Sequence, residues 1–348
     1  MIRFLINYID YIDYQKGVMS VCTAISVTVD CNYFGRNLDF ELSFGEKVII
    51  TTRNFEFSFR NGKTIKKHFA IIGMGIEREK FPLYFDATNE KGLSIAGLNF
   101  PGNVKYMDKM DGADNVASFE FIPWILTQCE SVKDALELLK KINITNEAFD
   151  EKLTPSPLHW IIADKIETVA VEQTEDGIKI FQDPVGVLTN NPTFDVQMFN
   201  LTNYMSTTAE EAKNVLSDKL DLKPYSRGMG GIGLPGDLSS ASRFVKTSFL
   251  KLNSVFGKTE QEIINQFFHI LYSVYQIRGA VKVQDEYEIT HYTSCCNTDM
   301  GIYYYTTYNN SQINAVSLFA ENLESDKLIC QELILEQKIS PQNTRDEY

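Results

Sequence analysis

The segment CTAISVTV, residues 22–29, is the first regular element that the sequence predicts. From residue 23 onward it alternates and is rich in β-branched residues, which is typical of a β-strand. Similar runs follow it at residues 48–52, 68–74, 83–86 and 93–99. The polar segment NEKG, residues 89–92, separates the last two runs and predicts a hairpin.

Helical periodicity replaces this pattern in the middle of the chain. Helices are expected at about 117–128, from Ser131 to Ile142, at about 239–254 and at about 259–277. Capping boxes mark two of these starts, Ser131 with Asp134 and Thr259 with Glu262. The segment 195–230 is polar and rich in loop formers, with some helix expected in it.

Further β-runs lie on either side of the second helical block. Three of them predict a meander, at residues 158–163, 168–173 and 178–181, and four more end the chain, at 287–294, 301–307, 312–317 and 327–335. Sheets at both ends of the chain with helices between them indicate an α+β fold, in which helices lie on the faces of sheets. No linker-like stretch divides the chain, so residues 22–348 are expected to form one domain, with a frayed tail after Ile339.

Composition excludes several classes of function. The chain has 348 residues, of which 44% are hydrophobic and 23% charged, a globular mixture that can bury a large core. Its net charge of -13 gives no basic footprint for nucleic acid and disfavours anionic membranes. No stretch approaches 18 apolar residues, so no membrane span is expected.

The cysteines and histidines give no support to a metal site. Six cysteines are spread over a chain without a secretory signal, which indicates reduced thiols and a cytoplasmic, bacterial location. No paired CxxC motif exists, and the four histidines show no HxxxH or HExxH spacing. We therefore expect neither a metal nor another cofactor.

The chain start has features of an extension. Residues 1–18 contain only short apolar runs, interrupted by Asp10 and Asp13, and do not resemble a signal peptide. Met19 is a candidate for the native start, which makes residues 1–18 a segment outside the native protein. Residues 1–21 as a whole are expected to be an extension or pre-peptide.

Cys22 follows this extension at the start of the first strand. A cysteine is most often a buried structural thiol. An N-terminal cysteine, however, can use its own α-amine as the base, because that amine titrates near neutral pH. Cys22 is therefore a candidate nucleophile that needs no histidine nearby, provided that the residues before it are removed.

Several polar residues are candidates for supporting such a nucleophile. Arg36 and Asp39 form either a surface ion pair in a turn or a pair in which Asp39 holds the amine and Arg36 orders the thiolate. Asn99 and Asn190 end apolar runs, where amides either cap turns or line an oxyanion hole. Arg243 follows a tight Leu-Pro-Gly turn that can direct its side chain inward.

Ten segments of the chain resemble, in the same order, those of the choloylglycine hydrolase family, which contains bile salt hydrolases and penicillin V acylases. They are CTA (22–24), FGRNLD (34–39), NEKGL (89–93), AGLNF (96–100), LHW (158–160), VEQ (171–173), GVLTNNPTF (186–194), LPGD (234–237), ASRF (241–244) and GIYYY (301–305). The resemblance that they carry extends over nearly all of residues 22–335. The resemblance implies an αββα sandwich of the N-terminal nucleophile hydrolase type and a homotetramer, to which the 195–230 segment would contribute.

The resemblance also implies roles for individual residues. Cys22 would be the nucleophile, and its freed amine the base, in amide hydrolysis through a thioester. Arg36 and Asp39 would order and activate Cys22. Asn99, Asn190 and Arg243 would complete the catalytic set, the two asparagines at the oxyanion and Arg243 through its charge.

Substrate preference follows from a narrower part of the resemblance. Bile salt hydrolases carry Asn at the position of Asn99, where penicillin V acylases often carry Tyr, so conjugated bile salts are the expected substrates and penicillin V the alternative. Leu38, Phe44 and Phe85 are candidates for an apolar wall against a sterol, and equally for ordinary core residues.

One departure from the family pattern concerns the residues before the nucleophile. Many members begin Met-Cys, whereas here Met19, Ser20 and Val21 precede Cys22. Autocatalytic removal of a short pre-peptide, which some members perform, would free the amine. A chain that keeps this segment would be a catalytically silent binding protein, the alternative from a different class.

Overall fold

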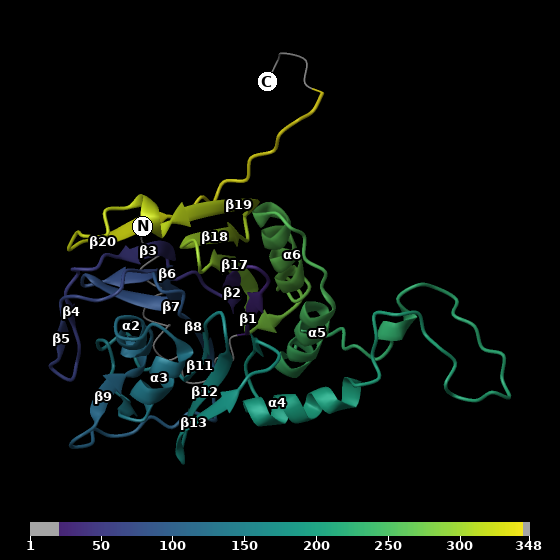
Figure 1. Cartoon of the computed structure of the whole chain (residues 1–348), viewed down its shortest axis with the longest axis horizontal. Coiled ribbons are helices and arrows are strands. Elements are labelled where there is room, and N and C mark those ends of the chain that lie inside the picture. The colour runs from purple at the N-terminus through teal and green to yellow at the C-terminus, as the bar shows by residue number, and fades with distance from the viewer. Residues whose placement is uncertain (1–20, 344–348) are drawn as a thin grey trace.

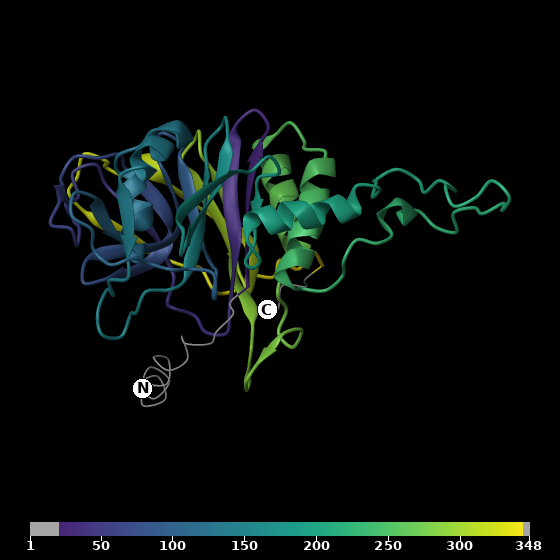
Figure 2. The same ribbon diagram turned by 90° about the horizontal axis from the view of Figure 1, so that it is seen from below.

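The computed structural model describes residues 21–343, so the predictions about residues 1–18 and Met19 concern residues outside the described range. Two large sheets lie face to face, each covered on its outer face by helices (Figures 1 and 2). Helices α5 (Ser240–Asn253) and α6 (Glu260–Tyr272) cover one sheet, and α2 (Phe121–Leu126) and α3 (Val132–Leu139) cover the other. The chain is thus an α+β fold, as the sequence pattern predicts, and a four-layer αββα sandwich, as the family resemblance implies.

Both sheets are antiparallel throughout. The six-stranded sheet has the order β14 (Val187–Leu188), β1 (Cys22–Thr28), β2 (Asn32–Phe40), β17 (Ile289–Asn297), β18 (Ile302–Thr307) and β19 (Asn310–Ser317). The eight-stranded sheet has the order β13 (Gly177–Gln182), β12 (Thr168–Thr174), β11 (Leu158–Ala163), β8 (Ser94–Asn99), β7 (Phe81–Asn89), β6 (Ile71–Arg78), β3 (Lys47–Thr51) and β20 (Leu328–Glu332).

Smaller elements complete the fold. Three short strand pairs are β4 (Phe57–Ser58) with β5 (Thr64–Ile65), β9 (Asp114–Ala117) with β10 (Ile142–Thr145), and β15 (Lys282–Val283) with β16 (Glu286–Tyr287). The remaining helical pieces are α4 (Phe194–Leu201), η1 (Ser118–Glu120), η2 (Thr202–Tyr204), η3 (Met229–Gly231) and η4 (Leu318–Ala320). Within residues 21–343, no helix is long and apolar enough to cross a membrane.

The apolar core occupies both faces of the eight-stranded sheet. Along β11, Ile161 belongs to the buried cluster shared with the other sheet, while its neighbours Trp160 and Ile162 belong to the cluster under α2 and α3. Successive side chains of a strand point to opposite faces. Because both faces are covered, such strands read as continuous apolar runs.

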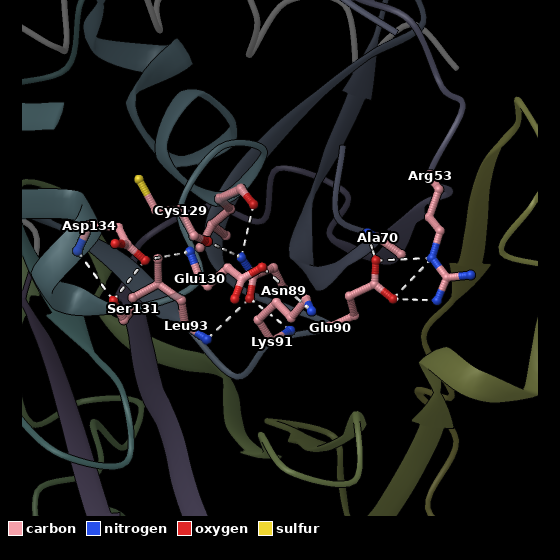
Figure 3. Close-up of polar contacts among 11 residues, drawn as sticks. Arg53, Ala70, Asn89, Glu90, Lys91, Leu93, Cys129, Glu130, Ser131 and Asp134 are labelled. Atoms are coloured by element: carbon pink, nitrogen blue, oxygen red, sulfur yellow. Dashed lines mark hydrogen bonds and ion pairs between the residues drawn. The ribbon is translucent and has the colours of Figure 1, made fainter. Parts of the chain in front are cut away.

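The predicted hairpin at 89–92 ties this sheet to the helix above it (Figure 3). The Asn89 side-chain nitrogen donates to the carbonyl oxygens of Leu126 and Cys129, at 2.9 and 2.8 Å, and its oxygen accepts from the backbone N–H groups of Lys91 and Leu93. The turn residue therefore anchors the end of α2, and the hairpin delivers β8, which ends at Asn99, to the site.

One expectation about secondary structure is wrong, and one of two alternatives left open by the sequence is excluded. Ile142 does not extend the preceding helix: α3 ends at Leu139, and Ile142 starts β10, which pairs in parallel with β9. Tertiary strand pairing overrides the helical spacing here. Arg36 and Asp39 are not a surface pair in a turn, because both are buried in β2, a strand whose polar residues hid its alternation.

The other predicted helices are confirmed with adjusted ends. The helix expected at 239–254 is α5, and the last expected helix begins with its capping box but ends at Tyr272. The first block begins with the turn η1, and α2 then ends at Leu126.

Candidate active site

Cys22 is the first residue of β1, between β14 and β2. It pairs with Leu38 of β2, and it is buried with 2% of its surface exposed. On the other side of β1, β14 pairs with Ala24 and delivers Asn190 two residues after its end. The backbone N–H of Cys22 donates to the Asn190 side-chain oxygen at 2.7 Å.

Arg243 holds the Cys22 segment from the helical side. It lies in the first turn of α5 and is fully buried. Its guanidinium donates to the carbonyl oxygen of Cys22, to Oγ1 of Thr23 at 2.5 Å and to Oδ1 of Asn190 at 2.7 Å. Arg243 therefore fixes the nucleophile's main chain and the neighbouring amide at once.

Arg36 approaches Cys22 from the opposite side, between the sheets. Its Nη1 donates to the carbonyl oxygens of Gly97 and Phe85, at 2.5 and 3.1 Å, so β2 is joined to the eight-stranded sheet at this point. The preceding Gly35 has no alternative, because a Cβ there would lie 2.0 Å from the Ser294 carbonyl oxygen of β17. The glycine thus lets β2 and β17 approach closely beside Arg36.

Asp39 faces away from the cavity side of β2. Thr290 Oγ1 of β17 donates to Asp39 Oδ1 at 2.5 Å, and Oδ2 is buried without a hydrogen-bond partner in the described part of the chain. Burial raises the pKa of Asp39 to about 7, against the opposing charges of Arg243 and Arg36. In this chain Val21 still precedes Cys22, and the Cys22 N–H donates to Asn190. The predicted hydrogen bond between the Cys22 nitrogen and Asp39 is therefore not formed.

The thiol itself lies in a mixed electrostatic environment. Burial raises the pKa of Cys22 above its ordinary value, and the negative charge of Asp39 acts in the same direction. Arg36, Arg243 and a hydrogen bond from the Asp39 backbone lower it. The two guanidinium groups therefore favour the thiolate, which is the nucleophilic form.

The two predicted oxyanion residues meet although 91 residues separate them. Asn190 Nδ2 donates to the Asn99 carbonyl oxygen at 2.7 Å, and the Asn190 N–H donates to Ser240 Oγ at 2.8 Å. An amide nitrogen carries two N–H donors. The Asn99 carbonyl oxygen accepts from one of them.

A cavity of about 190 Å³ opens in front of the thiol. Cys22, Arg36 and Asn99 form part of its wall, and Leu38, Phe44 and Phe85, the predicted apolar residues, also line it. The rings of Phe44 and Phe85 are 5.5 Å apart. A polar end at the thiol and an apolar wall beyond it suit an acyl group with a large apolar body.

The sequence reasoning missed part of this wall. The loop at residues 153–158 and the rings of Phe119 and Phe149 also line the cavity. The prolines at 155 and 157 mark a loop, and Leu158 pairs with Asn99. That pairing places the loop at the Asn99 end of β8, but it is visible only once the strand order is known.

Among residues 21–343, no group of three or more His, Cys, Asp or Glu side chains is arranged to hold a metal ion. The chemistry that the described residues can perform is that of a thiol, amide donors and two guanidinium groups.

Comparison with known proteins places the same residues in a family context. Residues 22–331 match the model of linear amide C–N hydrolases, choloylglycine hydrolase family. The chain is 51% identical over 310 residues to the bile salt hydrolase/transferase of Lactiplantibacillus plantarum, covering 89% of this chain and 96% of that protein. It is 41% identical over 318 residues to the conjugated bile acid hydrolase of Lactobacillus gasseri, covering 89% of this chain and 99% of that protein.

Solved structures agree with this result. The conjugated bile acid hydrolase of Clostridium perfringens matches with a TM-score of 0.86 and 35% identity, over 92% of this chain and all of that one. Penicillin V acylase from Agrobacterium tumefaciens matches with a TM-score of 0.71 and 16% identity, over 91% of this chain and 94% of that one. At this identity the match shows a similar fold.

Proposed function

The chain belongs to the choloylglycine hydrolase family of linear amide C–N hydrolases, and we propose that it hydrolyses the amide bond of bile salts conjugated to glycine or taurine. The observation that carries this proposal is the position of Cys22, in the wall of an apolar cavity and beside Asn99. Relatives that cover most of the chain bear the names of bile salt hydrolases, which supports the substrate class.

In the proposed reaction, the Cys22 thiolate attacks the carbonyl carbon of the substrate amide. The freed α-amine of Cys22 takes the thiol proton and later gives it to the leaving amine, which departs as glycine or taurine. Water then cleaves the thioester and releases the bile acid. The base requires that residues 1–21 be removed first.

The surrounding residues have separate proposed tasks. The side-chain amides of Asn190 and Asn99 would stabilise the oxyanion, because uncharged amide donors can stabilise charge that develops in the transition state. Asp39, whose Oδ2 is buried without a described partner, would accept from the new ammonium group. Arg36 and Arg243 would favour the thiolate.

The apolar wall is the proposed binding surface for the steroid. Leu38, Phe44 and Phe85 would pack against its rings, with the conjugated side chain directed at Cys22. Burial of apolar area drives such binding, at about 25 cal/mol per Å². Penicillin V, with a smaller phenoxyacetyl group, would fill less of this wall.

Parallel assays test the substrate proposal. The processed protein is incubated with glycocholate, taurocholate and penicillin V, and the released glycine, taurine and 6-aminopenicillanic acid are measured. We expect the bile salts to be the better substrates. Release from penicillin V alone would reject the bile salt proposal and favour the acylase.

We further propose that the protein assembles as a homotetramer through the arm between α4 and α5. This arm extends far from the sandwich (Figures 1 and 2) and carries exposed apolar residues, among them Met205, Val215 and Tyr225, which are 84 to 91% exposed. Exposed apolar groups on such a segment are typical of an interface. Light scattering of the protein and of its Val215→Asp variant tests this, and a monomeric parent protein would reject it.

A further inference from the structure

We propose that Glu288 is the positioning residue that holds the segment before Cys22 while the chain cleaves its own Val21–Cys22 peptide bond. This inference rests on the proposed role of Cys22 as an N-terminal nucleophile. Glu288 lies between β16 and β17, far in sequence from the bond, and it carries none of the roles proposed above.

The contact that carries the proposal is made by the Glu288 carboxyl group. Its Oε1 accepts a hydrogen bond from the Val21 backbone N–H at 2.6 Å. Glu288 is fully buried, and its Oε2 has no partner in the part of the chain that the structure describes. A buried carboxyl group is costly unless it is hydrogen-bonded. Here the bond to Val21, in the segment to be removed, satisfies one of its two oxygens.

Two successive backbone N–H groups are held on either side of the bond to be cut. Glu288 holds that of Val21, and Asn190 holds that of Cys22 at 2.7 Å. Arg243 donates to the Cys22 carbonyl oxygen on the far side. The peptide unit between Val21 and Cys22 is therefore fixed at both ends, beside the thiol that must attack it.

The cleavage needs water as its one co-reactant. The Cys22 sulfur attacks the Val21 carbonyl carbon, forming a C–S bond while the C–N bond to Cys22 breaks. The thiol proton goes to the departing nitrogen, which becomes the α-amine. Water then hydrolyses the thioester, giving a peptide that ends in the Val21 carboxylate and a free Cys22 thiol.

The protonation of Glu288 makes the role sharply testable. Burial and the nearby charge of Asp39 raise the pKa of Glu288 to about 8, so the neutral carboxyl group is well populated at neutral pH. Its carbonyl oxygen still accepts from Val21. A glutamine has the same shape and the same acceptor, so Glu288→Gln should retain the contact, whereas Glu288→Ala removes it.

The first experiment follows processing of the full chain. The parent protein, Glu288→Ala, Glu288→Gln and the matched control Glu286→Ala, an exposed glutamate in the neighbouring strand β16, are sampled over time by intact mass spectrometry. Loss of an oriented hydrogen bond predicts that Glu288→Ala exposes Cys22 about tenfold more slowly. Glu288→Gln and Glu286→Ala should process at the parent rate, and parent-rate processing of Glu288→Ala would overturn the proposal.

The second experiment separates positioning from a direct role in hydrolysis. The chain is produced behind a tag whose protease leaves Cys22 as the first residue, so self-cleavage is bypassed. Glu288→Ala should then recover at least about tenfold in bile salt hydrolysis over its own full-length form. No recovery would overturn the proposal, because Glu288 would then act on substrate or on folding. If the parent protein processes normally but releases neither glycine nor taurine, the proposed function fails and the role of Glu288 stands.

Discussion

The two faces of β2 have different surroundings in the candidate site. Arg36, Leu38 and Phe40 point to the cavity, while Asn37 and Asp39 point to the opposite side. There the Asn37 side chain donates to the Leu271 carbonyl oxygen of α6, and Asp39 accepts from Thr290. The alternation follows directly from the two-residue period of a strand.

Neighbouring residues of one strand can therefore have different kinetic roles. On the cavity face, Leu38 would be in contact with bound substrate in the proposed function. On the other face, Asp39 would act on the nucleophile, whose main chain Arg243 holds. Substitutions on the two faces should therefore separate into effects on KM and effects on kcat or processing.

Cys22 lines the cavity, and Arg243 holds its main chain, so its removal should have the largest effect. In protein whose extension has been removed by a tag protease, Cys22→Ala is expected to lower the release of glycine and taurine at least about a thousandfold, because the covalent step is lost. Cys31→Ala, in the turn after β1, should keep parent activity. A Cys22→Ala protein with a tenth of parent activity would exclude Cys22 as the nucleophile.

Asn190 is hydrogen-bonded to Cys22, Arg243 and Asn99, so its substitution should have the second largest effect. Its oxygen accepts from Cys22 and Arg243, and its nitrogen donates to the Asn99 carbonyl. Asn190→Ala, also in pre-cut protein, should lower kcat by about 10²- to 10³-fold, the usual loss for one oxyanion donor. Urea unfolding serves as the stability control, and exposed Asn203→Ala as the matched variant. Unchanged kcat with a raised KM would assign Asn190 to substrate binding alone.

Asp39, on the far face, should change the pH dependence of stability. Its folded-state pKa is about 7 against an ordinary value of 3.8, so between these values the folded chain binds more protons than the unfolded chain. The free energy of unfolding therefore falls as pH rises. From pH 5 to 7, the parent protein should lose about 2 kcal/mol relative to Asp39→Asn, measured by urea unfolding at each pH. Parallel pH profiles would mean that Asp39 is ionised throughout.

The sequence predicts the layers well because they depend on local periodicity. The capping box at Thr259 and Glu262 forms as expected, and β11 to β13 are close to the predicted meander. The helix prediction at Ile142 is wrong because long-range pairing with β9 outweighs the local helical spacing of this residue.

The site was accessible to the sequence only in part. Cys22 and Arg36 lie in short motifs that could be matched, but spacing alone could not bring Asn99 and Asn190 together from different sheets. Glu288 carries no local signal, because its partner Val21 is 267 positions away. Contacts of this kind depend on the tertiary fold.

Leu38 tests the cavity face with the smallest expected effect. Its neighbour Asp39 faces the other way, so one step along β2 should change the phenotype from pH dependence to substrate affinity. Leu38→Ala in pre-cut protein should raise KM for taurocholate about tenfold and leave kcat within about twofold, because the lost contact is made equally in the ground state and the transition state. Phe85→Ala should act in the same direction, and Phe199→Ala, exposed on α4, should act on neither constant. A fall in kcat with unchanged KM for Leu38→Ala would mean that the two faces of β2 are not functionally separate.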